Sequence, residues 1–218
     1  MPAPAIRLHD GWWVPTLCSG PGKFLRRAQA IPYALRFWEG PRRLALQAGA
    51  HIGVWPSVLA QHFARVTCWE PGPDNWACLQ RNLADTPAVT CQYGALGATR
   101  GTVDVSIQPH STGGHHVALT RSHPYVTVPL YTIDGQCFDE VDAIFLDTEG
   151  FEIPILEGAA QTIAVCRPLL VLENNGCSRK YGHDLSALPW YLAERHRYRE
   201  VGTVGEDAIF VLAPEERL

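Results

Sequence analysis

The chain has 218 residues, of which 46% are hydrophobic and 18% are charged, and these fractions are typical of a folded globular protein. This length fits one domain with a sizeable buried core. The formal net charge of −4 provides no overall field that would attract nucleic acid, so a nucleic-acid substrate is disfavoured but not excluded.

From Leu44 onward, short apolar runs alternate with amphipathic stretches, which is the pattern of an α/β protein with a mostly parallel sheet. The predicted elements in chain order are strand 44–48, helix 54–63, strand 66–70, helix 74–83, strand 89–93, an extra hairpin of 102–107 and 125–130, strand 141–147, helix 153–165, strand 169–173, helix 185–195, and strands 198–204 and 208–212. Gly205-Glu206-Asp207 joins the last two strands and suits a tight antiparallel return.

Residues 1–43 are predicted to form an N-terminal cap on the substrate side, and residues 44–218 the remainder of a single compact domain. The basic residues Arg26-Arg27, Arg36 and Arg42-Arg43 in this cap are interpreted as a solvated basic surface, with a phosphate- or sugar-acid-binding patch as the alternative. No apolar run approaches the roughly 20 residues of a membrane span, and the start of the chain lacks the pattern of an export signal. We therefore expect a cytoplasmic protein whose seven cysteines are reduced thiols.

A glycine-containing turn, Gly49-Ala50-His51-Ile52-Gly53, follows the first predicted strand and opens a helix. Glycine allows close backbone approach to a ligand, and unpaired N–H groups at a helix N-terminus attract an anionic moiety. Glu70 ends the next strand, where a carboxylate can accept hydrogen bonds from both hydroxyls of a ribose. The third glycine of a dinucleotide fingerprint is absent, so the predicted ligand is a nucleoside without pyrophosphate.

Two further apolar strands end in groups of oxygen-bearing side chains. Asp147 and Glu149 follow the first, where a carboxylate can orient a substrate hydroxyl, bind a metal or face a ligand's cationic end. Glu152 is assigned instead to the first turn of the following helix, where it favours the helix dipole. Because the two strands are expected to be neighbours, Asp147, Glu173 and Asn174 form a candidate Mg²⁺ site, with metal-free hydrogen bonding as the alternative.

Residues 44–173 resemble the FkbM family of S-adenosylmethionine-dependent methyltransferases. The segments that carry the resemblance are, in order, Gly49-Ala50-His51-Ile52-Gly53, Ala64-Arg65-Val66-Thr67-Cys68-Trp69-Glu70-Pro71, Ala95-Leu96-Gly97, Leu130-Tyr131-Thr132-Ile133-Asp134, Phe145-Leu146-Asp147-Thr148-Glu149-Gly150-Phe151-Glu152, Gly158-Ala159-Ala160 and Arg167-Pro168-Leu169-Leu170-Val171-Leu172-Glu173. The resemblance implies a Rossmann-like class I fold with a seven-stranded, mostly parallel sheet and an antiparallel last strand. It also implies S-adenosylmethionine as the cofactor and methyl transfer to a hydroxyl oxygen of a sugar or other small molecule.

By this resemblance, the predicted cofactor-binding residues are Gln47, Gly49, Ala50, His51, Gly53, Glu70, Gly94, Ala95 and Asp147. The glycine turn would border the methionine part, Glu70 the ribose, and Gly94-Ala95 the adenine. The family commonly has an acidic residue at position 47, where Gln47 lacks the charge attraction for the cofactor's ammonium group.

Methylation of oxygen requires a group that removes the hydroxyl proton. The predicted catalytic residues are Asp147, Glu149 and His115, the last chosen from a loop that also holds His110 and His116. This loop is interpreted as an exposed polar segment, with a substrate lid or a transition-metal site as alternatives.

Two other functions remain open. A methyltransferase acting on a macromolecule is one, although nucleobase-nitrogen enzymes often have Asn/Asp-Pro-Pro-aromatic where this chain has Asp147-Thr148-Glu149-Gly150. A catalytically weakened binding module is the other, and Gln47 is the residue that points to it.

Overall fold

The computed structural model describes residues 4–108, 110–120 and 124–214. The strands are β1 (Ile6–His9), β2 (Trp12–Pro15), β3 (Leu44–Ala48), β4 (Arg65–Glu70), β5 (Val89–Tyr93), β6 (Ala95–Leu96), β7 (Gly101–Ser106), β8 (His116–Val117), β9 (Tyr125–Tyr131), β10 (Ala143–Leu146), β11 (Leu169–Glu173), β12 (Tyr198–Val204) and β13 (Asp207–Leu212). The α-helices are α1 (Gly22–Arg27), α2 (Ala30–Ala34), α3 (Val54–Leu59), α4 (Pro73–Asn82), α5 (Glu152–Glu157), α6 (Ala160–Cys166) and α7 (Ala187–His196).

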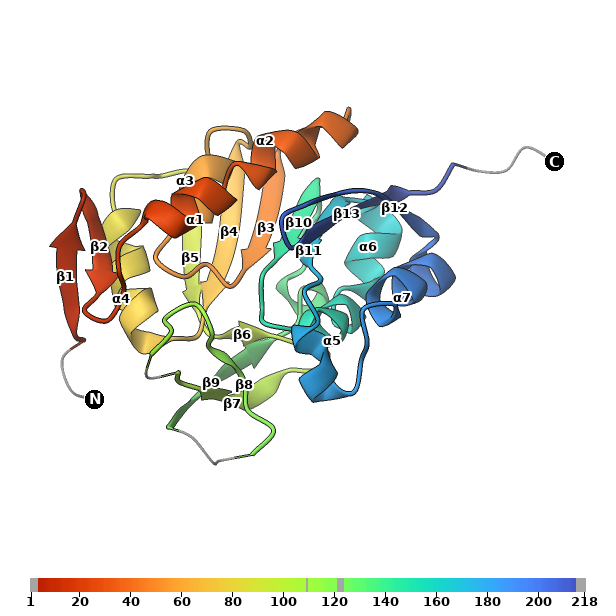
Figure 1. Ribbon diagram of the computed structural model, residues 1–218. Helices are drawn as coiled ribbons and strands as arrows, with labels where there is room; N and C mark the ends of the chain where they lie inside the picture. Colours follow the sequence, from red (N-terminus) through yellow and green to blue (C-terminus); the bar gives the residue numbers. More distant parts are fainter. Residues whose placement is uncertain (1–3, 109, 121–123, 215–218) are drawn as a thin grey trace.

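A seven-stranded sheet with the order β12-β13-β11-β10-β3-β4-β5 forms the centre of the molecule (Figure 1). Strand β13 is antiparallel to both of its neighbours, and the pairs from β11 through β5 are parallel. The predicted α/β class, the seven-stranded sheet and its antiparallel last strand are therefore confirmed. The return between β12 and β13 pairs Val204 with Asp207, as the turn residues predicted.

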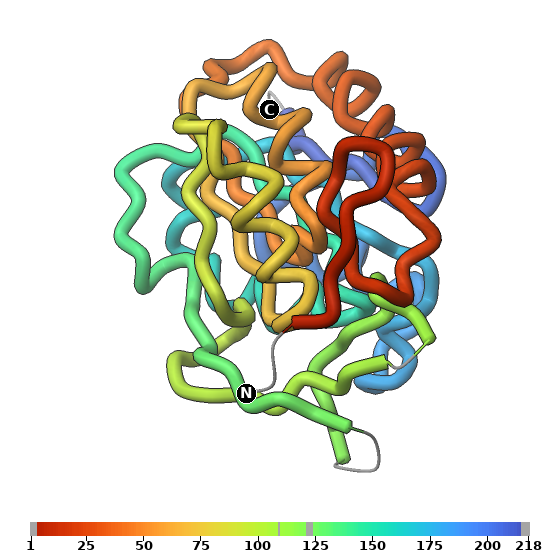
Figure 2. The backbone as a smooth tube through the Cα atoms, turned by 90° about the vertical axis from the view of Figure 1, so that its left-hand side faces the viewer, coloured from red at the N-terminus to blue at the C-terminus, as the bar shows by residue number. Residues whose placement is uncertain are grey.

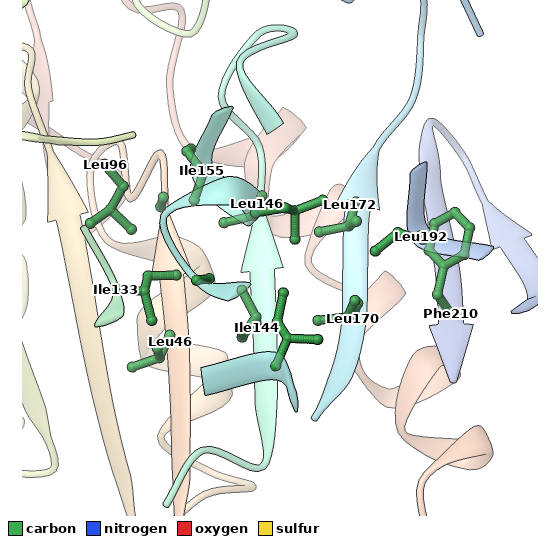
Figure 3. Close-up of a cluster of buried hydrophobic side chains, with 14 of the residues drawn as sticks. Leu46, Leu96, Ile133, Ile144, Leu146, Ile155, Leu170, Leu172, Leu192 and Phe210 are labelled. Carbon is green, nitrogen blue, oxygen red and sulfur yellow. The ribbon is translucent and has the colours of Figure 1, made fainter. Parts of the chain in front are cut away.

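The central strands are buried on both faces because helices cover each side of the sheet. Leu46, Ile144 and Leu170 belong to the cluster that packs against α5, α6 and α7 (Figure 3). Their neighbours in sequence, such as Phe145 and Val171, point to the opposite face, where α2 and α3 cover them. This two-sided burial explains why β10 and β11 are continuous apolar runs. Their first polar residues, Asp147 and Glu173, come only where the strands end.

A second sheet, with the order β6-β9-β7-β8, lies beyond the carboxyl ends of β3, β4 and β5 (Figure 1). Strands β7 and β9 pair in an antiparallel manner, which confirms the predicted extra hairpin. Of the histidines singled out in the sequence, His110 and His115 lie in the loop between β7 and β8, and His116 begins β8. This sheet therefore brings that loop to the edge where the parallel strands end.

The N-terminal hairpin β1-β2 lies alongside α4 (Figure 2). Asn82 fixes it there, since its Oδ1 accepts a hydrogen bond from Trp13 N at 2.7 Å and its Nδ2 donates to Trp13 O at 2.9 Å. Helices α1 and α2 then cross one face of the main sheet (Figure 1). Among the described residues, the helices are too short or too polar to cross a membrane.

The single helix predicted over residues 153–165 is wrong, because the chain forms α5 and α6 with a break at Gly158-Ala159. Asp134 causes the second helix to start afresh: its carboxylate accepts hydrogen bonds from the N–H groups of Gln161 and Thr162 at 3.0 and 2.8 Å. Gly158 lies so close to the main chain of Gly97 that a side chain there would overlap the Gly97 carbonyl oxygen. Apolar periodicity continues through such a break and cannot reveal it.

We predict that Gly158→Ala lowers the free energy of unfolding by about 2 kcal/mol, because the added methyl group must displace backbone atoms. Denaturant-induced unfolding of the whole chain measures this loss. Gly22→Ala is the matched control, since its Cβ would meet only Arg26 Nη1, at 3.5 Å. Equal stability of the two variants would contradict the tight Gly158–Gly97 approach.

Candidate functional site

A cavity of about 270 Å³ opens at the carboxyl ends of β3, β4 and β10, next to the point where the strand order reverses. Ligands of open parallel sheets bind at such a reversal. Six segments line the cavity: the glycine turn, the three stretches that follow β4, β5 and β10, the N-terminal segment around α1, and the loop between β7 and β8. The cavity therefore joins parts of the chain that are far apart in sequence.

The glycine turn is held tightly against the ends of β4 and β10. Gly49 has φ +79°, and a side chain there would overlap the carbonyl oxygen of Asp147. The N–H groups of Gly49 and Ala50 donate to Trp69 O at 3.1 and 3.0 Å, and that of His51 donates to the Glu70 carboxylate at 2.8 Å. These three N–H groups are thus used within the protein, contrary to the expectation that the turn presents unpaired donors to an anion.

The predicted cofactor-binding residues divide into two groups. Those that line the cavity are Gly49, Ala50, His51, Glu70, Gly94, Ala95 and Asp147. Gln47 and Gly53 are not among the residues that line the cavity. Gln47 is 1% exposed, and its Nε2 donates to the carbonyl oxygens of Ala48 and Gly49 at 3.1 and 3.0 Å. Gly53, with φ +97°, begins α3 and packs against Leu79 and Leu83.

Glu70 is the most highly coordinated acid at the cavity. Its Oε2 accepts from His51 N, and its Oε1 accepts from Gly72 N at 2.8 Å and Asn75 Nδ2 at 3.3 Å. Burial raises the pKa of Glu70 to about 7, although these donors oppose that shift. Asn75, the third residue of α4, also lines the cavity and is 2% exposed, and it was not among the residues predicted from the sequence.

The loop between β7 and β8 covers the cavity rather than standing free in solvent. Asn75 Nδ2 donates to Thr112 O at 2.8 Å, and Thr112 Oγ1 lies 3.0 Å from His51 Nε2. His110, His115 and His116 all line the cavity. The interpretation of this segment as an exposed polar loop holds for His110, Ser111 and Gly113, whereas Thr112 is hydrogen-bonded to α4 and to the glycine turn.

His115 is placed at the cavity as predicted, but its hydrogen bonding favours donation over proton acceptance. Its Nδ1 accepts a hydrogen bond from Gln108 N at 3.1 Å. Burial lowers the pKa of His115 to about 4, so the ring is neutral near physiological pH. A neutral ring whose Nδ1 is an acceptor has its proton on Nε2.

Asp147 and Glu149 line the cavity, and Glu173 lies beside them at the end of β11. One carboxylate oxygen from each of these three residues lies within 4.8 Å of the other two. Burial raises the pKa of Asp147 and raises that of Glu173 to about 9. Asn174, the third residue of the predicted Mg²⁺ site, has its Nδ2 donating to Leu185 O at 3.1 Å.

A guanidinium group occupies this acidic cluster. Arg27 Nη2 lies 3.3 Å from both Asp147 Oδ2 and Glu173 Oε1, and the Arg27 side chain is 22% exposed. The sequence pattern placed Arg27 on a solvated basic surface. The structure shows instead that Arg27 is largely buried among carboxylates. The set predicted to bind Mg²⁺ gains no support from this arrangement, because a positively charged side chain already contacts two of its three members.

Solved structures share this architecture. A methyltransferase FkbM from Methylobacillus flagellatus KT is similar with a TM-score of 0.55 and 20% identity, over 78% of this chain and 43% of that one. A precorrin-6y C5,15-methyltransferase from Geobacter metallireducens GS-15 gives a TM-score of 0.50 and 12% identity, over 95% and 97% of the two chains. A magnesium protoporphyrin IX methyltransferase from Synechocystis PCC 6803 gives 0.52 and 11%, over 87% and 84%.

The fold is accordingly that of the class I S-adenosylmethionine-dependent methyltransferases. Within that class, residues 47–199 match the methyltransferase FkbM domain, so the chain belongs to the FkbM methyltransferase family. It spans less than half the length of the FkbM structure that it matches. A comparison with curated proteins gives no match.

The raised pKa of Glu70 predicts a pH dependence of stability. The folded state binds this proton more tightly than the unfolded chain, whose carboxyl has a pKa near 4.5. The associated stability is full below about pH 4.5 and is lost as the pH rises through about 7. Relative to Glu70→Gln, the wild type should therefore lose at most about 1.4 kcal/mol of unfolding free energy per pH unit across this range.

Urea unfolding at a series of pH values measures that difference. The exposed Glu39→Gln serves as the control and should follow the wild-type curve. Parallel curves for the wild type and Glu70→Gln would show that Glu70 has no raised pKa.

Proposed function

We propose that this chain transfers the methyl group of S-adenosylmethionine to a hydroxyl oxygen of a sugar or other small molecule. The observation that carries the proposal is the joining of the glycine turn to Glu70 at the cavity, through the 2.8 Å hydrogen bond from His51 N. This bond places a carboxylate beside a turn that admits close backbone approach, as a nucleoside cofactor requires. Membership of the FkbM family agrees with this cofactor.

In this proposal, Gly49 and Ala50 border the methionine part of the cofactor, Glu70 binds the ribose, and Gly94-Ala95 borders the adenine. Two carboxylate oxygens offer about four acceptor positions. Three N–H groups already use the Glu70 carboxylate, which leaves room for about one ribose hydroxyl. Asn75 Oδ1 is buried without a hydrogen-bond partner among the described residues, and we assign the other hydroxyl to it.

Bound S-adenosylmethionine supplies an activated methyl group on a sulfonium. The chain must then align the acceptor oxygen with that methyl and take up the hydroxyl proton. Asp147 and Glu149 are the carboxylates of the cavity wall that can orient the hydroxyl and accept the proton. His115, with its proton on Nε2, is suited to donate a hydrogen bond to the acceptor.

A small acceptor is favoured over a macromolecule by the enclosure of the cavity. The loop between β7 and β8 lies along the cavity, and Phe24 and Trp55 contribute apolar surface to its lining. Aromatic and polar groups together suit a sugar or a polyketide-like ring. A divalent cation is not part of the proposed transfer.

Isothermal titration of the whole chain with S-adenosylmethionine tests the cofactor assignment. We expect saturable binding that Glu70→Gln weakens about tenfold, because hydrogen bonds to a charged acceptor contribute about 1.5–3 kcal/mol. Asp85→Asn, an exposed change after α4, should bind like the wild type. Absence of binding by the folded wild type at millimolar cofactor would show that the chain is not an S-adenosylmethionine-dependent enzyme.

Transfer of a labelled methyl group to a panel of sugars, phenolic and aliphatic alcohols, and RNA tests the acceptor class. Product with a small hydroxyl compound, reduced strongly in Asp147→Asn and Glu149→Gln, would support the proposal. Product with RNA alone would overturn the acceptor class while leaving the cofactor assignment intact.

A further inference from the structure

Arg27 is the centre of an ion-pair group that joins three strand ends to the N-terminal segment. Its Nη2 lies 3.3 Å from Asp147 Oδ2 and Glu173 Oε1, 3.6 Å from Glu206 Oε2 and 3.9 Å from Asp207 Oδ1. The four acids come from the ends of β10 and β11 and from the turn that leads into β13. A single guanidinium nitrogen thus lies within 4 Å of four carboxylates that come from three separate places in the sequence.

The acids around Arg27 have the spacing of a cation site. One oxygen each of Asp147, Glu149 and Glu173 lies within 4.8 Å of the others, a distance at which one ion with metal–oxygen bonds of about 2.0–2.6 Å could contact all three. Glu173 is 3% exposed, and its Oε2 is buried with no hydrogen-bond partner in the described part of the chain. Buried carboxyl groups in such excess are tolerated only if some of them hold a proton or a positive charge lies nearby.

We propose that Arg27 is the resident cation of this cluster and holds it in a metal-free state. The guanidinium contacts two of the three carboxylates that a metal would need, so a divalent ion placed among them would meet a like charge at close range. The arginine is part of the fold itself, on a helix whose Lys23 and Phe24 also line the cavity. Helix α1, which packs on the sheet (Figure 1), therefore supplies both the cation and part of the cavity lining.

This inference deepens the proposed function, since it makes the carboxylates beside the transfer centre independent of metal. Its own test is the binding of Mn²⁺, which requires neither cofactor nor acceptor. Failure of the methyltransferase proposal and failure of this one are therefore distinguishable.

The experiment compares Mn²⁺ binding by the wild type and Arg27→Met, followed by the electron paramagnetic resonance signal of free Mn²⁺. We expect no specific site in the wild type and one site in Arg27→Met with at least tenfold higher affinity. Arg26→Met, an exposed change of the preceding residue on the same helix, should behave like the wild type. The double variant Arg27→Met/Glu173→Gln should lose the new site.

Thermal unfolding provides a second readout. Arg27→Met should unfold at a lower temperature because its carboxylates lack a counter-charge, and Mn²⁺ should restore part of that loss. Mn²⁺ should leave the wild type and Arg26→Met unchanged. Restoration by Mn²⁺ identifies lost charge, since a variant that had lost only packing contacts would gain nothing from the ion.

One Mn²⁺ bound by the wild type and lost in Glu173→Gln would overturn the proposal, as would a folded Arg27→Met that gains no Mn²⁺ site. If Arg27→Met does not fold, Arg27→Lys takes its place, because a lysine keeps the positive charge. The absence of a Mn²⁺ site in both Arg27→Lys and the wild type would then support the proposal, and a wild-type site that depends on Glu173 would still refute it.

Discussion

The close passage of the Gly49 main chain against Asp147 is the constraint on which the site depends. Strands β3 and β10 are parallel neighbours, and the chain leaves β3 in a left-handed turn that only glycine adopts without strain. No side chain fits between the turn and the Asp147 carbonyl oxygen. The turn is therefore fixed relative to Asp147 on one side and, through His51 N, to Glu70 on the other.

Several acidic side chains are buried at this edge of the main sheet. The rest of the chain must therefore provide hydrogen-bond donors or positive charges for them. Glu70 obtains three N–H donors from the turn, from the start of α4 and from Asn75. Glu152 is buried in a similar way, with its Oε1 accepting from Thr148 N and Oγ1 at 3.0 and 2.8 Å. The cluster of Asp147 and Glu173 has a charged partner instead, the guanidinium group of Arg27.

Sequence patterns revealed those parts of the site that depend on strand ends. Glu70 and Asp147 follow apolar runs, and apolar runs of that length indicate strands whose carboxyl ends meet at one edge. Arg27 could not be found in this way, because its pairing with Asp147 depends on how α1 packs on the sheet. Gln47 and Gly53 show the limit of the motif, which identified the turn but not which of its residues line the cavity. Asn75 could have been predicted from the sequence. It lies in the first turn of the helix that begins at Pro73, shortly after Glu70.

The residues that line the cavity come from two parts of the chain, one inside and one outside the region that matches the FkbM domain. The residues that match the FkbM domain begin at position 47, whereas Lys23, Phe24 and Arg27 come from the segment before it. Part of the cavity lining thus lies within the family's shared region and part lies outside it. Changes in the N-terminal segment can therefore alter the shape and charge of the cavity while the turn at Gly49 and the acid at Glu70 stay as they are.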